Sequence, residues 1–159
     1  MAHVTIPVST VPSVKRYIAE EVTNAMVGRV AQGHGVLVSY DPPGRYRPDD
    51  IIAIGNLWDR QVSGFNMVGT GGKAWLKEEY ELEITSTVRR AGESLQVEAY
   101  ERAHELNSIV ESVVREDPSL GGRVIVARPR NTRDEADWGK DSKGFIVHVI
   151  TRIYVMAQI

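Results

Sequence analysis

The sequence predicts a single α+β domain over residues 1–159, with two helices packed on one face of a largely antiparallel sheet in the order α-β-β-β-α-β-β. Three observations predict it. Two segments place apolar residues at helical spacing, and several others alternate apolar and polar residues as strands do. The length suits one domain that buries its own core, and no repeat or low-complexity linker divides the chain.

The two expected helices are marked at their ends. The first follows Pro12, whose missing N–H suits a first helical turn, and we expect it to end by Gly33. The second should run from about Ser94 to Glu116, because the residue before Pro118 is pushed out of the helical region. Each carries one apolar stripe, which predicts that each covers a core.

Five strands are expected, at residues 35–40, 51–60, 76–90, 122–127 and 145–159. In the third, apolar residues alternate with Glu79, Glu81 and Glu83, so these three carboxylates share one face. That acidic row is interpreted either as a solvated strand face or as the lining of an assembly surface.

The segments 61–75 and 129–144 are expected to be long polar loops that make contacts. Loops of this length in a small domain are usually functional or disordered. These two contain Phe65, Met67 and Trp138, and aromatic residues and methionine are enriched at contact sites.

The last expected strand is apolar on both faces. Its odd-numbered residues suffice to face the core, yet its even-numbered residues include Ile146, Ile150, Tyr154 and Met156, where a half-solvated sheet would carry polar groups. Two interpretations remain open. A bend near Thr151 splits the strand into two internally buried halves, or another subunit covers the second face, since monomers rarely expose large apolar patches.

Composition and motifs predict a protein that is not an enzyme and holds no cofactor or metal. The chain has no cysteine, its four histidines are scattered, and no serine lies in a Gly-x-Ser-x-Gly turn. Gly69 to Lys73 lacks the spacing of a phosphate-binding loop, because Met67 and Ala74 occupy positions that need glycine and a hydroxyl residue. A net charge of −2 predicts no general attraction to nucleic acid or membranes.

The segment order over roughly residues 51–159 resembles that of tail terminator and tail-completion proteins of long-tailed bacteriophages. The resemblance rests on residues 79–84, on the helix end at 103–122, on the strand at 124–129 and on the terminal strand closing at 155–159. It implies a subunit of a homo-oligomeric ring, a hexamer in this family, without a cofactor. Such a ring sits at the head-tail junction of the virion after assembly in the host cytoplasm.

The resemblance also implies partners. The ring caps the tail tube, ends its polymerisation and joins it to the head, so it contacts the tube protein and a head-tail connector while DNA passes without sequence-specific binding. Candidate subunit-interface residues are Phe65, Met67, Trp138, Ile146, Ile150, Tyr154 and Met156. Candidate channel-lining residues, whose negative charge would repel phosphate, are Glu79, Glu81, Glu83, Asp134, Glu135 and Asp137.

Two alternatives stay open at this point. One is a small-molecule- or peptide-binding α+β domain with a discrete apolar pocket. The other is a neighbouring head-tail connector protein of similar build.

If another subunit covers the terminal strand, replacing Ile150 and Tyr154 together with glutamate should give a folded subunit in a smaller assembly. Sedimentation reports the mass and circular dichroism reports the fold. An unchanged mass would favour the internally buried, bent strand.

Overall fold

The computed structural model describes residues 8–26, 35–40, 48–64, 76–138 and 144–159. Its elements in chain order are α1 (Val11–Met26), β1 (Val36–Tyr40), β2 (Asp50–Gly64), β3 (Leu76–Arg90), a 3-10 turn η1 (Glu93–Leu95), α2 (Gln96–Glu116), β4 (Val126–Trp138) and β5 (Phe145–Gln158). The predicted order α-β-β-β-α-β-β is confirmed.

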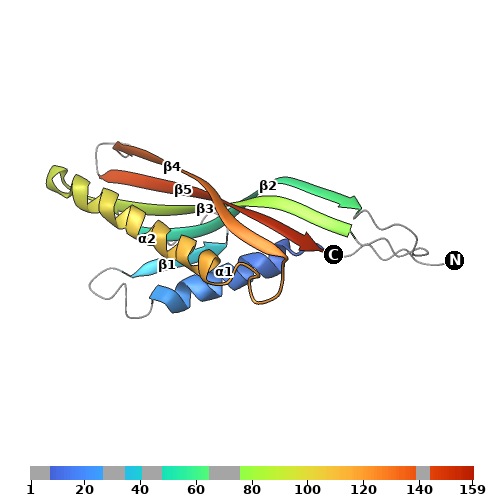
Figure 1. Cartoon of the computed structure of the whole chain (residues 1–159). Helices are drawn as coiled ribbons and strands as arrows, with labels where there is room; N and C mark the ends of the chain where they lie inside the picture. The colour runs from blue at the N-terminus through green and yellow to red at the C-terminus, as the bar shows by residue number, and fades with distance from the viewer. Residues whose placement is uncertain (1–7, 27–34, 41–47, 65–75, 139–143) are drawn as a thin grey trace, which may run out of the picture.

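The five strands form one sheet in the order β1-β2-β3-β5-β4. β1 runs parallel to β2, and the other three neighbouring pairs are antiparallel. Both helices pack on the same face of this sheet, as Figure 1 shows. The α+β fold is therefore confirmed, with a mixed sheet that is antiparallel in all but one pair.

The core lies between the helices and one face of the two central strands. From α1 and α2, the side chains of Ile18, Val22 and Leu106 are fully buried. They meet the even-numbered residues of β3 and the odd-numbered residues of β5, which alternate with less buried ones. Alternation with a period of two thus selects the core face of each strand, as the sequence predicted.

β5 is one continuous strand. It pairs with β3 from Phe145↔Arg90 to Gln158↔Lys77 without a register shift. The interpretation of a bend near Thr151 that buries both halves internally is therefore wrong, because the even-numbered residues of β5 all lie on the face away from the helices.

Two expected segment boundaries need correction. Residues 129–138 belong to β4 instead of a polar loop, and the strand expected at 122–127 begins only at Val126. β4 is an edge strand whose side chains are mostly exposed on both faces, so its sequence lacks the apolar alternation that identifies a half-buried strand. β2 likewise continues to Gly64, past the expected end at residue 60, and residues 65–75 lie outside the described part.

A buried carboxylate on β3 holds the start of α1. Thr10 begins the helix, since its carbonyl accepts the first helical hydrogen bond from the Val14 amide at 2.9 Å. The fully buried Glu78 carboxylate accepts hydrogen bonds from the Ser9 hydroxyl (2.6 Å), from the Thr10 amide (2.9 Å) and hydroxyl (2.5 Å), and from Arg60 Nε (2.7 Å). A negative charge at a helix N-terminus also complements the helix dipole.

A second buried ion pair links the sheet to α2. Asp50, at the start of β2, is fully buried and receives Arg90 from β3 at 2.5 Å and Arg102 from α2 at 3.0 Å. Because each charge meets an opposite one, their burial is compensated. The two carboxylates Glu78 and Asp50 therefore fix one helix each against the sheet.

We expect Glu78→Gln to lower the free energy of unfolding by about 1.5–3 kcal/mol, the contribution of hydrogen bonds to a charged group. The neutral glutamine offers one carbonyl oxygen where Glu78 offers two carboxylate oxygens, and it carries no charge to pair with Arg60. The matched control is Glu79→Gln on the opposite face, whose partly exposed pair with Lys77 should contribute less than about 1 kcal/mol. Urea unfolding measures both, and equal losses would contradict the prediction.

The effect should depend on pH. Burial alone would raise the pKa of the Glu78 carboxyl, but the hydrogen bonds from Ser9, Thr10 and Arg60 outweigh it and hold that pKa below its ordinary value. The stabilisation is then present above the unfolded pKa of about 4.3 and is lost as the pH falls through the lower folded pKa. The difference between the native chain and Glu78→Gln should shrink below about pH 4.

Candidate assembly surface

The face of the sheet opposite the helices, here called the open face, is the surface that the sequence analysis singled out. No helix of the described residues covers it (Figure 1). It carries the odd-numbered residues of β3 and the even-numbered residues of β5, with flanking residues from β2 and β4.

The two residue sets predicted on β3 and β5 lie directly beside each other on this face. Glu79 lies opposite Met156, and Glu81 lies opposite Tyr154. Ile150 and Ile146 continue the same row. One set was predicted as a subunit interface and the other as a channel lining, yet cross-strand neighbours share one environment. The two assignments therefore compete for a single surface.

The acidic row on β3 is paired with bases. Arg130 Nη1 lies 2.8 Å from Glu81, and Arg152 lies 3.7 Å from both Glu81 and Glu83. At the end of the row Lys77 Nζ lies 2.7 Å from Glu79, which also accepts a hydrogen bond from the Tyr154 hydroxyl at 2.8 Å. Along this row the open face thus carries acidic and basic side chains that neutralise one another.

These basic partners are the residues that sequence reasoning missed. Arg152 lies in the terminal strand and Arg130 in the segment expected as a polar loop, and the sequence analysis assigned neither of them a role. Pairing them with Glu81 requires the register of three strands, which no local pattern in the sequence contains.

Guanidinium groups also cover the aromatic rings of the open face. Arg128 and Arg130 lie over the Tyr154 ring, at 5.3 and 5.2 Å from its centroid, and Arg152 lies 4.5 Å from the centroid of Trp58. Cation–π contacts of this kind are favourable and remove ring surface from water. The arginines therefore supply part of the cover that the sequence analysis assigned to another subunit.

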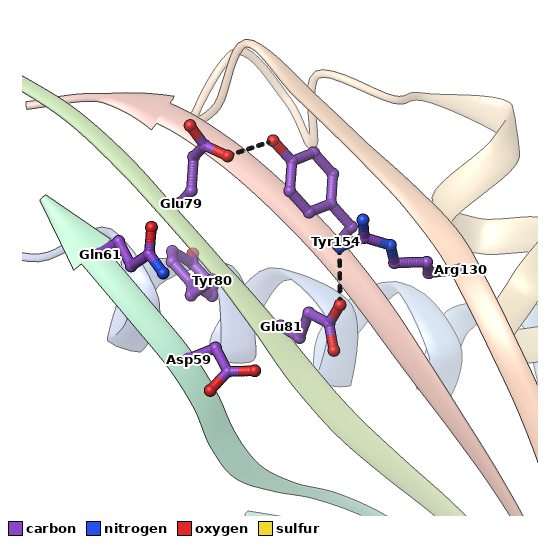
Figure 2. Close-up of a pocket in the computed structure, with 7 residues that line it drawn as sticks. All are labelled: Asp59, Gln61, Glu79, Tyr80, Glu81, Arg130 and Tyr154. Atoms are coloured by element: carbon purple, nitrogen blue, oxygen red, sulfur yellow. Dashed lines mark hydrogen bonds and ion pairs between the residues drawn. The ribbon is translucent and has the colours of Figure 1, made fainter. Parts of the chain in front are cut away.

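A hollow of about 270 Å³ lies at the centre of this network, and Figure 2 shows the residues around it. Its lining comes from four strands: Asp59, Gln61, Glu79, Tyr80, Glu81, Arg130 and Tyr154. β2 is irregular here, with a register shift between Trp58 and Gln61 and a positive φ of 48° at Asp59. Among the described residues Asp59 has no ion-pair or hydrogen-bond partner.

The second predicted acidic set, on β4, is divided between two faces. Asp134 faces α2, where it accepts a hydrogen bond from the Tyr100 hydroxyl and lies 3.1 Å from His104 Nε2. Glu135 and Asp137 lie on the open face, opposite His148 and Ile146. The structure therefore does not bring these three carboxylates together as one lining.

The remaining predicted interface residues have different positions. Trp138 ends β4, is 37% exposed and packs against Phe145 with ring centroids 5.5 Å apart. Phe65 and Met67 lie outside the described residues.

Metal-binding clusters and membrane-spanning helices are both absent from the described part of the chain. No group of three or more His, Asp or Glu side chains there is arranged to hold a metal ion. None of the helices described is both long enough and apolar enough to cross a membrane.

Comparison with known proteins gives a distant structural similarity. No protein-family model and no curated protein sequence matches the chain. A chain in a structure of the virion of a native gene transfer agent particle aligns with a TM-score of 0.34 and 10% sequence identity, over 91% of this chain and 98% of that one. The two chains superpose only loosely, so the similarity assigns no family.

The structure sharpens the test on β5. Ile150 is only 8% exposed, so glutamate there would place a charge among buried groups. We expect Ile150→Glu alone to lower the free energy of unfolding by at least about 2 kcal/mol, whereas Ile150→Val should cost about 0.5–1.5 kcal/mol. Urea unfolding measures both changes. An Ile150→Glu variant as stable as the natural chain would contradict the prediction, because the glutamate would then have to reach solvent without cost.

Proposed function

We propose that this chain is a virion structural protein, and not an enzyme, that assembles with copies of itself into a ring capping the phage tail tube. In this proposal the ring ends tube polymerisation and joins the tube to the head. The observation that carries the self-assembly is a sheet that, in the described part of the chain, has helices on one face only and no further strand at either edge. The tail-terminator role follows from the resemblance in segment order.

Both edges of the sheet leave backbone groups without a partner strand among the described residues. β1 pairs only with Asp50 to Ile54, so the rest of β2, from Gly55 to Gly64, is unpaired on that side. At the other edge no described strand pairs with the outer side of β4, although near its start the Ala127 amide donates a hydrogen bond to the Pro118 carbonyl at 2.7 Å. Exposed edges readily accept a further strand, and closing a ring of copies removes them.

The open face suits the wall of a channel through which DNA moves. Glu79, Glu81 and Glu83 each form an ion pair with a lysine or an arginine, so these cations are not free to bind phosphate. Affinity for DNA depends on cations that can replace its counterions. A wall of paired charges would let DNA pass without being held.

The binding-domain alternative receives less support from the cavities. The hollow in Figure 2 is lined mostly by charged and polar side chains, whereas small-molecule sites are mostly apolar with a few polar groups. A second hollow, beside Ile51, Ala53 and Ile146, is more apolar but measures only about 270 Å³, below the usual size of such sites.

The ring is tested by mass in solution. Sedimentation equilibrium over a range of concentrations should give six times the subunit mass of 17.7 kDa, the stoichiometry that the resemblance implies. A monomer at all concentrations, or a closed two-fold dimer, would contradict the proposed ring.

The terminator role needs a second experiment, because a connector could also form a ring. Adding the protein to the polymerising tube protein of the same phage should shorten the tubes in proportion to the amount added, with one end capped in electron micrographs. A head-tail connector would leave the tube length unchanged. Heat-denatured protein at equal concentration is the control.

A further inference from the structure

We infer that successive copies in the ring meet edge to edge, with β4 of one copy beside β1 and the free part of β2 of the next, and with Arg128 paired to Asp59 across the contact. This inference rests on the proposed ring and names the surface that builds it. It moves the subunit contact from the open face to the edges of the sheet.

Strand direction makes the two edges compatible. β4 runs opposite to β5, β5 opposite to β3, and β3 opposite to β2, while β1 follows β2. β4 is therefore opposite in direction to β1 and β2. Rotation about an axis along the strands preserves direction, so β4 of one copy would meet the next copy as an antiparallel neighbour, the more stable form of pairing.

The register places matching segments at the same level. Followed from strand to strand across the sheet, the neighbours of Tyr40 are Ile54, Ile84, Thr151 and finally Thr132. In the same way, Val36 lies level with Ala136. The whole of β1 is thus level with residues 132–136 on the opposite edge. Two copies related by rotation, without a shift along the axis, bring these segments together.

The backbone of β4 offers free groups at this level. Leu76 and Ile159 donate backbone hydrogen bonds to each other, and in an antiparallel ladder such pairs recur at every second residue. The backbone N–H and C=O groups of the odd-numbered residues of β5 therefore bond to β3, and those of the even-numbered residues are directed toward β4. The residues of β4 that lie opposite even-numbered residues of β5, such as Arg133 and Glu135, therefore direct their backbone N–H and C=O groups toward β5. Thr132, Asp134 and Ala136 alternate with them and turn their N–H and C=O groups outward.

Two unpaired charges of opposite sign fall at one level of these edges. Arg128 lies opposite Tyr154, which lies opposite Glu81 and then Trp58, the neighbour of Asp59. Arg128 contacts the Tyr154 ring and has no carboxylate partner in the described part of the chain, and Asp59 has no cation. Both lie on the open face, Asp59 beside the hollow of Figure 2.

Within one copy these two charges cannot meet. Three strand spacings separate β2 from β4, which is about 14 Å at roughly 4.8 Å per spacing. Across a contact between the two edges they become neighbours. The complementarity therefore favours a second copy of this chain as the partner.

Disulfide trapping tests the contact directly, because the natural chain has no cysteine. The variant Asp59→Cys/Arg128→Cys cannot bridge within one copy, since a disulfide requires Cα atoms within about 7 Å. Mild oxidation should give a ladder of linked species that ends at the ring size and collapses on reduction. The control Asp59→Cys/Asp137→Cys, with the second cysteine at the far end of β4, should give no ladder.

A proline substitution tests the strand pairing. Ala136→Pro removes one outward N–H and leaves the ladder with β5 intact, as prolines at sheet edges do. It should raise the protein concentration needed for half-assembly at least tenfold with an unchanged circular dichroism spectrum, while Ala136→Val, which keeps the N–H, should assemble like the natural chain.

The outcomes separate this inference from the proposed function. If the natural chain forms a ring but the Asp59→Cys/Arg128→Cys variant, shown by sedimentation to keep that ring, gives no ladder, the edge contact is overturned and the ring stands. If Ala136→Pro assembles as well as Ala136→Val, pairing of backbone edges is overturned. A natural chain that stays monomeric overturns both proposals.

Discussion

The unbroken ladder between β3 and β5 determines the arrangement of the other elements. Because fourteen consecutive positions, from Lys77↔Gln158 to Arg90↔Phe145, pair without a shift, each strand keeps one set of side chains on each face for its whole length. One face becomes a continuous apolar floor for both helices, and the other becomes the open face. A shift of one residue in this ladder would exchange the two faces. It would also separate Glu81 from Arg152 and Arg130.

Charge is distributed according to this division. On the helix side, Glu78 and Asp50 are fully buried, and each is satisfied by several donors that belong to different elements. Removing one partner of such a group leaves a buried charge without compensation, which is costly. On the open face the same residue types form partly exposed pairs, where each interaction is worth little but the set neutralises the surface. The buried pairs fix the helices, and the exposed pairs give the open face its charge balance.

Local patterns were sufficient to predict the central part of the fold. β3 was recognised from the apolar residues Tyr80, Leu82, Ile84 and Val88, which recur on one face, and α2 is bounded by Asp117 before Pro118. β4 could not be recognised, because a strand exposed on both faces carries no apolar periodicity. The helix cap at Glu78 joins residues 68 positions apart, and the parallel pairing of β1 with β2 depends on tertiary packing. The position of the arginines also depends on contacts between distant segments. The sequence therefore predicted an interface set and a channel set, and only the pairing of β3, β5 and β4 shows that both sets and the arginines share one face.

Placing the subunit contact at the edges resolves the competition between those two sets. If another copy covered Ile146, Ile150, Tyr154 and Met156, it would also bury the carboxylates beside them. Both the carboxylates and the arginines paired with them would then lose their contact with water. Desolvating several ion pairs at once is expensive, and their mutual attraction rarely repays it fully. A contact along β4 and β1 leaves these pairs hydrated. It joins backbone groups that are otherwise unpaired and adds a single ion pair between Arg128 and Asp59. In the proposed ring the open face then remains free of subunit contacts, as the wall of a channel requires.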